Sequence, residues 1–134
     1  RVGRIAFAAP FAGGVLAAAE GLANPEPWGA WSDGRQVKLR FARPLPKQLT
    51  VLLTANAFPP TAGQEFVLVL GTQRRPFRLA ATPQDRFFTF ETDGTQTEMM
   101  FEIPQPVSPQ SIGYGPDMRK LGLAFTRLEI GIGE

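Results

Sequence analysis

Short runs of alternating polar and apolar residues, separated by segments rich in proline and glycine, dominate this chain from residue 37 onward. Val37, Leu39 and Phe41 alternate with Lys38 and Arg40, and a period of two is typical of a β-strand with one buried face. No stretch has the amphipathic periodicity over about 10–15 residues that the helices of a βαβ fold need. The pattern therefore predicts an all-β fold and argues against an α/β fold.

Further segments of the same character indicate how the strands are arranged. We expect strands at residues 5–7, 37–41, 50–58, 65–70, 77–79, 86–92, 97–103 and 121–132. The loops between them, such as residues 44–47, 59–63 and 104–109, are short and contain proline. Seven to nine short strands with such loops are typical of an antiparallel β-sandwich. We predict one jelly-roll-like sandwich over residues 1–134.

Three local features refine this prediction. Asp93-Gly94 is a strong turn signal and predicts a tight hairpin between residues 86–92 and 97–103. In the last strand the apolar residues change from odd to even positions, so a β-bulge near Thr126 and Arg127 would keep both sets inward. The predicted core includes Phe66, Leu68, Phe88, Phe90, Phe101, Leu123 and Phe125.

An uncharged run at residues 5–19 imitates the apolar region of a signal peptide. Pro10 and Gly13-Gly14 interrupt it, and it is shorter than the roughly 20 residues of a membrane-spanning helix. We expect no membrane insertion by this segment. Residues 15–20 are predicted to form a helical turn that ends at Gly21.

The absence of histidine and cysteine excludes several kinds of chemistry. The chain has no disulfide, no thiol nucleophile, no zinc–thiolate site and no Ser–His–Asp triad. A hydrolase would need a pair of carboxylates, but Glu98 and Glu102 would lie about 13 Å apart along a strand, beyond the roughly 5–9.5 Å of glycosidase pairs. We expect no catalysis by this chain alone, no metal and no cofactor.

Charge gives little sign of a nucleic-acid partner. The net charge is +2, and the densest positive cluster is Arg74, Arg75 and Arg78. A nucleic-acid-binding surface would need a longer basic stripe interleaved with aromatic residues. We expect no nucleic-acid binding.

Residues 21–34 form the first of two unusual loops and contain both tryptophans of the chain. Trp28 and Trp31 lie between Pro25, Pro27 and Gly34. Their indoles could stack on sugar rings, whose C–H groups suit an aromatic face. Alternatively, they fill one end of the sandwich, because large aromatic side chains are mostly buried.

The second unusual loop, residues 108–122, is polar and rich in glycine. Asp117 and Arg119 would point the same way on an extended chain and could bind a ligand with hydroxyl groups, or pair with each other to hold the loop. If the domain binds a ligand, we expect the site where this loop meets the tryptophan loop. The candidate ligand-binding residues are Glu26, Trp28, Trp31, Ser32, Tyr114, Asp117 and Arg119.

The sequence GLANPEPWGAWSDG, followed by LPKQLTVLLTANAF and later by SP…G…DMRKLGL, resembles the C-terminal β domain of bacterial phosphoglycerol transferases. These sulfatase-like enzymes act on osmoregulated periplasmic glucans, and similar domains end some membrane-bound glycosyltransferases. The resemblance picks out Glu26, Trp28, Gly29, Trp31, Ser32, Asp117, Arg119, Leu121 and Gly122. Ala30 departs from the pattern, which has arginine there.

This resemblance implies an accessory domain, because the catalytic site of the family is a metal site rich in Asp and His. It implies a periplasmic location within an inner-membrane-anchored protein. The implied partners are a glycan and the catalytic domain of the parent chain. The alternative is a structural module that packs against the rest of a membrane-bound transferase and binds no ligand.

Overall fold

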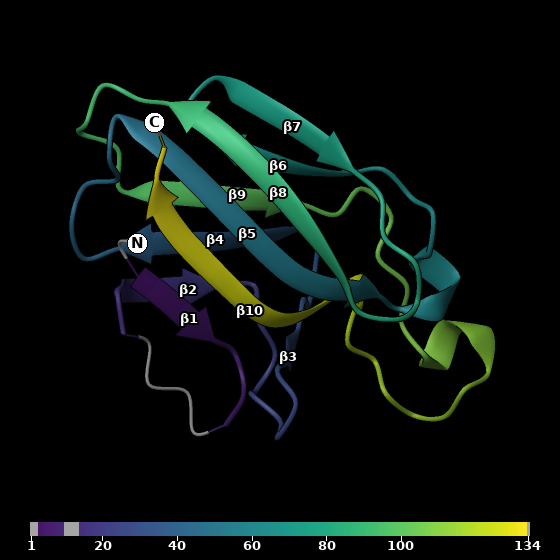
Figure 1. Cartoon of the computed structure of the whole chain (residues 1–134). Helices are drawn as coiled ribbons and strands as arrows, with labels where there is room; N and C mark the ends of the chain where they lie inside the picture. Colours follow the sequence, from purple (N-terminus) through teal and green to yellow (C-terminus); the bar gives the residue numbers. More distant parts are fainter. Residues whose placement is uncertain (1–2, 10–13, 134) are drawn as a thin grey trace.

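Two antiparallel sheets face each other in the computed structural model, which describes residues 3–9 and 14–133 (Figure 1). Sheet A contains β1 (Gly3–Ala6), β3 (Ala30–Trp31), β5 (Gln48–Ala57), β8 (Gln84–Glu91) and β10 (Leu123–Ile132). Sheet B contains β2 (Leu16–Glu20), β4 (Gln36–Phe41), β6 (Phe66–Leu70), β7 (Gln73–Phe77) and β9 (Glu98–Glu102). Two short 3₁₀ turns, η1 (Pro59–Thr61) and η2 (Gln110–Ile112), lie in loops.

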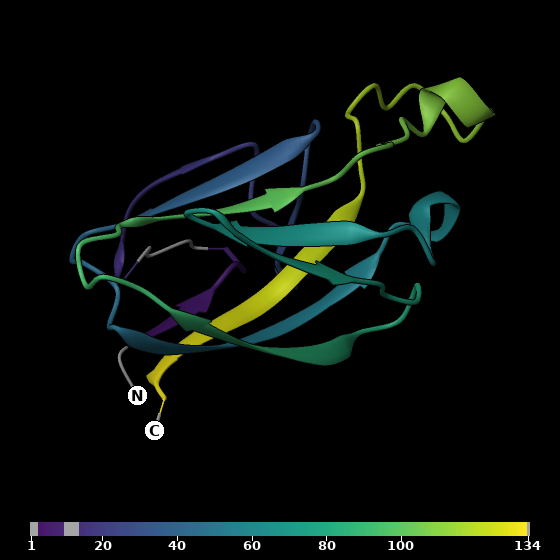
Figure 2. The same ribbon diagram turned by 90° about the horizontal axis from the view of Figure 1, so that it is seen from above.

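The strand order confirms the predicted antiparallel β-sandwich. Sheet A has the order β1-β10-β5-β8, with β3 beside β10, and sheet B has the order β2-β4-β9-β6-β7. From β4 onward every connection crosses between the sheets except the one from β6 to β7, and Figure 2 shows the two layers edge-on. The described residues form ten strands. β2 and β3 lie where no strand was predicted, and the strand expected at residues 77–79 is instead β7, at residues 73–77.

The space between the sheets is filled mainly by aliphatic and phenylalanine side chains. All of the predicted core residues are buried. Phe101 of β9 lies between Phe125 and Phe77, with ring centroids 5.1 and 6.3 Å away. Phe125 also contacts Phe7 at 5.2 Å, and Phe77 contacts Phe88 at 5.4 Å. The rings therefore connect the two sheets through one continuous aromatic cluster.

The predicted bulge in the last strand is confirmed. The pairing of β10 with β5 shifts register between Phe125 and Arg127. One extra residue at this point reverses the facing of the side chains that follow. Phe125 and Leu128 consequently both face the core, with no exposed surface.

The helical turn predicted at residues 15–20 is wrong, because Leu16–Glu20 forms β2 and pairs with β4. The alanines there favour a helix only weakly, and pairing with a neighbouring strand overrides such local preference. Pro10 and Gly13, which interrupt the same apolar run, lie outside the described residues. Among the residues that the structure describes, no helix is long and apolar enough to span a membrane.

The hairpin predicted at Asp93-Gly94 is also wrong. β8 pairs with β5 in sheet A, whereas β9 pairs with β4 and β6 in sheet B. Gly94 does adopt a positive φ of 81°, so the turn itself is present. It carries the chain from one sheet to the other instead of joining two paired strands.

Candidate functional site

A tight turn holds the first tryptophan at the surface. The N–H of Glu26 donates to the Gly29 carbonyl at 2.7 Å, and the N–H of Gly29 donates back to the Glu26 carbonyl at 3.2 Å. Gly29 lies so close to β10 that a Cβ atom there would approach the Phe125 carbonyl oxygen to 2.1 Å. The turn is thus fixed against the sandwich, and it leaves Trp28 38% exposed.

The two indoles have different environments. Trp28 contacts Trp31 edge-on, with ring centroids 5.3 Å apart. Trp31 in turn contacts the buried Phe58 at 5.7 Å and belongs to β3, which pairs with β10. Trp31 therefore packs against the end of the sandwich and supports Trp28, whose indole remains accessible to a ligand.

The second loop carries an ion pair with two-point contact. Arg119 donates from Nε to Asp117 Oδ1 at 3.0 Å and from Nη2 to Asp117 Oδ2 at 2.7 Å. The Arg119 backbone N–H donates to the same carboxylate at 3.0 Å. Such charge-assisted pairs have a defined orientation, so this pair fixes both the local backbone and the guanidinium plane.

The structure brings the two loops together. Arg119 Nη1 lies 3.8 Å from Glu26 Oε2, within the turn that carries Trp28. The N–H of Lys120 donates to Asp33 Oδ1 at 2.9 Å, and the N–H of Gly34 donates to the Lys120 carbonyl at 2.8 Å. We call the surface formed by Glu26, Trp28, Asp117 and Arg119 the two-loop site.

The ion pair also shifts the acidity of both groups. Hydrogen bonds from the Arg119 side chain and backbone hold the pKa of Asp117 below its usual value. The hydrogen bond to Asp117 raises the pKa of Arg119 despite partial burial, and the nearby charges of Asp117, Glu26 and Asp33 add to the effect. Both side chains therefore stay charged throughout the physiological pH range.

We expect replacement of Arg119 by glutamine to raise the pKa of Asp117 toward that of an ordinary carboxyl group, because the charged donor is lost. A pH titration followed by the ¹³C NMR signal of the Asp117 carboxyl group measures this pKa. In the unsubstituted protein the folded-state pKa lies below the unfolded-state value. The pair thus stabilises the loop fully above the unfolded-state pKa, and this contribution is lost as pH falls through the lowered folded-state pKa. An unchanged titration midpoint in Arg119→Gln would show that Asp117 owes its pKa to other groups.

Ser32, which was predicted to bind a ligand, has no exposed surface. Its hydroxyl oxygen accepts the N–H of Leu123 at 2.8 Å, while its own N–H donates to the Leu123 carbonyl at 2.7 Å. A buried hydroxyl that already bonds the backbone cannot reach a ligand at the surface. Ser32 therefore joins the tryptophan loop to β10, and we leave it out of the two-loop site.

Thr61 has a similar supporting role that the sequence analysis missed. Its buried hydroxyl lies 3.0 Å from the carbonyl oxygens of both Phe58 and Gly122. It thereby links η1, which lies beside the ring contacted by Trp31, to the loop that leads into β10. A threonine after two prolines in a loop gives no sequence signal for this contact.

The part of the second loop around η2 projects beyond the sandwich (Figure 2), and Tyr114, another predicted contact, follows η2 in the sequence. Its side chain is 69% exposed. The loop is ordered by its own backbone, since the N–H of Tyr114 donates to the Pro109 carbonyl at 2.9 Å and that of Gln110 to the Asp117 carbonyl at 2.8 Å. Tyr114 is thus accessible to solvent.

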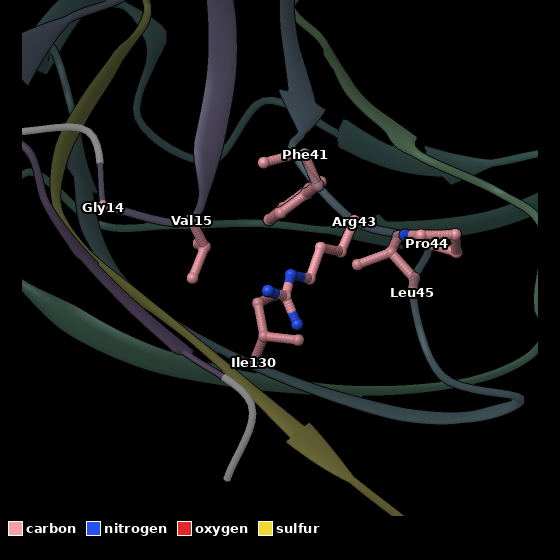
Figure 3. Close-up of a pocket in the computed structure, with 8 residues that line it drawn as sticks. Gly14, Val15, Phe41, Arg43, Pro44, Leu45 and Ile130 are labelled. Atoms are coloured by element: carbon pink, nitrogen blue, oxygen red, sulfur yellow. The ribbon is translucent and has the colours of Figure 1, made fainter.

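A separate pocket of about 370 Å³ opens between β4 and β10 (Figure 3). Buried apolar side chains line it, among them Phe41, Leu45 and Ile130, and the side chain of Arg43 extends across it. None of the predicted ligand-binding residues is among the described residues that line it. The pocket is therefore distinct from the two-loop site.

Comparison with known proteins places the chain in a family. The family described as "Domain of unknown function (DUF7024)" matches residues 2–132. The chain belongs to this family. No solved structure matches the DUF7024 chain.

Several curated relatives carry the name phosphoglycerol transferase I. The proteins from Citrobacter koseri and Salmonella arizonae are 28% identical to this chain over 116 residues, and the one from Escherichia fergusonii is 25% identical. The match covers 82% of this DUF7024 chain but spans only 15% of the length of each relative. The chain is thus similar to one small part of a much longer transferase, as the resemblance implied.

Proposed function

We propose that this DUF7024 chain is a non-catalytic accessory domain of a longer envelope-glycan-modifying transferase and that it holds a neutral glycan at the two-loop site. The observation that carries the proposal is an exposed indole fixed beside a group of hydrogen-bonding charges. Trp28 rises from the same turn as Glu26, and Glu26 lies beside Arg119 of the other loop.

The chemistry of the site suits sugar hydroxyls. The Trp28 indole offers a face to the C–H groups of a sugar ring. Glu26 and Asp117 accept hydrogen bonds from hydroxyls, and Arg119 donates them. One guanidinium faces two carboxylates, so the site has a slight excess of negative charge. This balance favours a neutral ligand over a phosphorylated one.

The accessory role is supported by the comparisons and by composition. The match covers 15% of the length of each relative, and these relatives are named phosphoglycerol transferase I. This chain contains no histidine or cysteine. We place the catalytic groups in another part of the longer protein. The resemblance to enzymes of periplasmic glucans further suggests a periplasmic location within an inner-membrane-anchored protein.

A second candidate function is a structural module without a ligand. Trp31 and Ser32, two of the residues that the resemblance picked out, are used for packing and for hydrogen bonds to β10. If Trp28 serves only the same purpose, its removal should cost stability and nothing else. Trp28 is therefore the residue that separates the two functions.

We expect Trp28→Ala to weaken binding of a neutral glucose oligosaccharide about tenfold, or ~1.4 kcal/mol, through the lost stacking surface. The melting temperature should fall by less than about 4 °C, since the side chain is partly exposed. Calorimetric titration and thermal unfolding measure the two effects. Phe87→Ala is the matched control, because it removes an exposed ring on another face and should leave affinity unchanged. A large loss of stability with no oligosaccharide binding by the unsubstituted protein would favour the structural module.

A further inference from the structure

The outer face of sheet A carries an exposed phenylalanine on its edge strand, β8. Phe87 in β8 is 64% exposed, although Phe88 and Phe90 of the same strand are buried. It lies opposite Leu52 of β5, which in turn lies opposite Glu129 of β10. Figure 1 looks onto this side of the sandwich. We call the surface around Phe87 and Leu52 the Phe87 face.

Two hollows flank Phe87. One, of about 530 Å³, is bordered by Thr50 and Thr89. The other, of about 300 Å³, is bordered by Leu52, Gly131 and Ile132. Thr50 lies between Thr89 and Gly131 in register, so this row of the sheet has only small side chains. The face thus combines a projecting ring with recesses that could receive side chains of a partner.

The row on the other side of Phe87 is polar and largely satisfied. Thr54 Oγ1 donates to Asp85 Oδ1 at 2.7 Å, and Arg127 Nη2 donates to Thr54 Oγ1 at 3.3 Å. Arg127 Nε also lies 3.4 Å from Glu129 Oε2. This side of the face thus holds one guanidinium and two carboxylates, linked by hydrogen bonds and an ion pair. An apolar centre with a polar rim is the usual composition of a protein–protein interface.

The C-terminal end of the described chain lies at the margin of this face, whereas Gly3 begins β1 on the opposite edge of sheet A. The N–H of Gly133 donates to the Gln48 carbonyl at 2.7 Å, and Gly133 borders the larger hollow. In the curated relatives the matched segment is 15% of the polypeptide. Chain that continues beyond Gly133 would therefore start beside the larger hollow that Phe87 borders.

We propose that the Phe87 face docks another part of the same longer polypeptide, with apolar side chains of that part seated beside the Phe87 ring. This inference rests on the proposed accessory role. Because covalent linkage raises the effective concentration to the millimolar range, a patch too small to hold two separate proteins together can hold two parts of one chain.

The Phe87 face and the two-loop site can be occupied at the same time. β10 begins at Leu123, which bonds Ser32 beside the tryptophan loop, and it ends at Ile132 beside the smaller hollow. The two surfaces thus lie toward opposite ends of this strand. Docking through the Phe87 face would leave the glycan site open to solvent.

Single cysteines introduced into the full-length protein that contains this chain test the proposal, because the chain itself has none. Thr89→Cys reports on the Phe87 face, and Arg40→Cys reports on an exposed position of β4 in sheet B. Alkylation at each introduced thiol is followed by mass spectrometry, and each rate is divided by the rate in denaturant. We expect Thr89→Cys to react at least tenfold more slowly than Arg40→Cys, and addition of Phe87→Ala to restore its labelling severalfold.

Equal rates at the two positions would overturn the proposal. Protection that disappears on dilution would instead assign the face to a second copy, and protection that requires added oligosaccharide would assign it to a glycan. Either result would also overturn it. The variant Trp28→Ala separates this proposal from the glycan site: it should weaken oligosaccharide binding about tenfold while leaving protection of Thr89→Cys unchanged.

Discussion

Replacement of Phe101 by alanine should lower the free energy of unfolding by about 3–5 kcal/mol, the usual cost of removing a buried phenylalanine. Phe101 has no exposed surface and contacts rings from both sheets, Phe125 in sheet A and Phe77 in sheet B. The cavity would open at the point where the sheets meet, and neither ring can fill it without leaving its other contacts. Urea unfolding followed by tryptophan fluorescence measures the change.

Met100→Ala is the matched control for this substitution. Met100 is the preceding residue of β9 and faces outward, only partly buried. Its removal should cost less than about 1 kcal/mol, because most partly exposed positions contribute little to stability. If Phe101→Ala cost no more than Met100→Ala, the facing of β9 in this structure would be wrong.

Alternation explains why the core was predictable from the sequence. Met99, Phe101 and Ile103 alternate with Glu98, Met100 and Glu102, and a strand has only two faces. The same rule located the bulge, since a change from odd to even apolar positions requires an extra residue if both sets stay buried. These inferences depend on neighbouring residues alone, so a single sequence suffices for them.

Partner strands were harder to predict, because a turn signal describes backbone direction and not pairing. Asp93-Gly94 makes the expected turn, yet β8 and β9 lie in different sheets. Pairing of β8 with β5 instead of β9 depends on contacts between residues far apart in sequence, such as Leu49 with Phe90. β2 was missed for a related reason, since pairing with β4 and not its own alanines determines its conformation.

The sequence predicted that the two loops meet, but it did not predict which of their residues contact one another. Two polar loops rich in proline and glycine pointed to one end of the sandwich, and Arg119 does lie beside Glu26 there. Burial of Ser32 could not be foreseen, because it follows from the approach of β10 across 91 positions of sequence. The different exposure of Trp28 and Trp31 likewise depends on Phe58, which lies in another loop.

The second large effect is expected at Gly29, which closes the turn that carries Trp28. A Cβ atom at this position would approach the Phe125 carbonyl oxygen to 2.1 Å. This oxygen belongs to the backbone of β10 and cannot rotate away, so the turn or the strand must move. Gly29 also has a φ of +155°, which L side chains rarely adopt. We expect Gly29→Ala to lower the free energy of unfolding by about 2–5 kcal/mol, as the sum of backbone strain and overpacking.

Gly34→Ala separates these two causes within the same loop. Gly34 has a φ of +113°, but nothing lies within 4 Å of a Cβ atom built there. Its substitution should cost only the backbone strain, about 1–3 kcal/mol. Gly29→Ala should exceed it by about 1–3 kcal/mol from the steric conflict with β10, and it should also weaken oligosaccharide binding by displacing Trp28 and Glu26. Equal losses of stability in the two variants would show that the turn does not rest against β10 in solution, and the positions of Trp28 and Glu26 in the two-loop site would then have no fixed support.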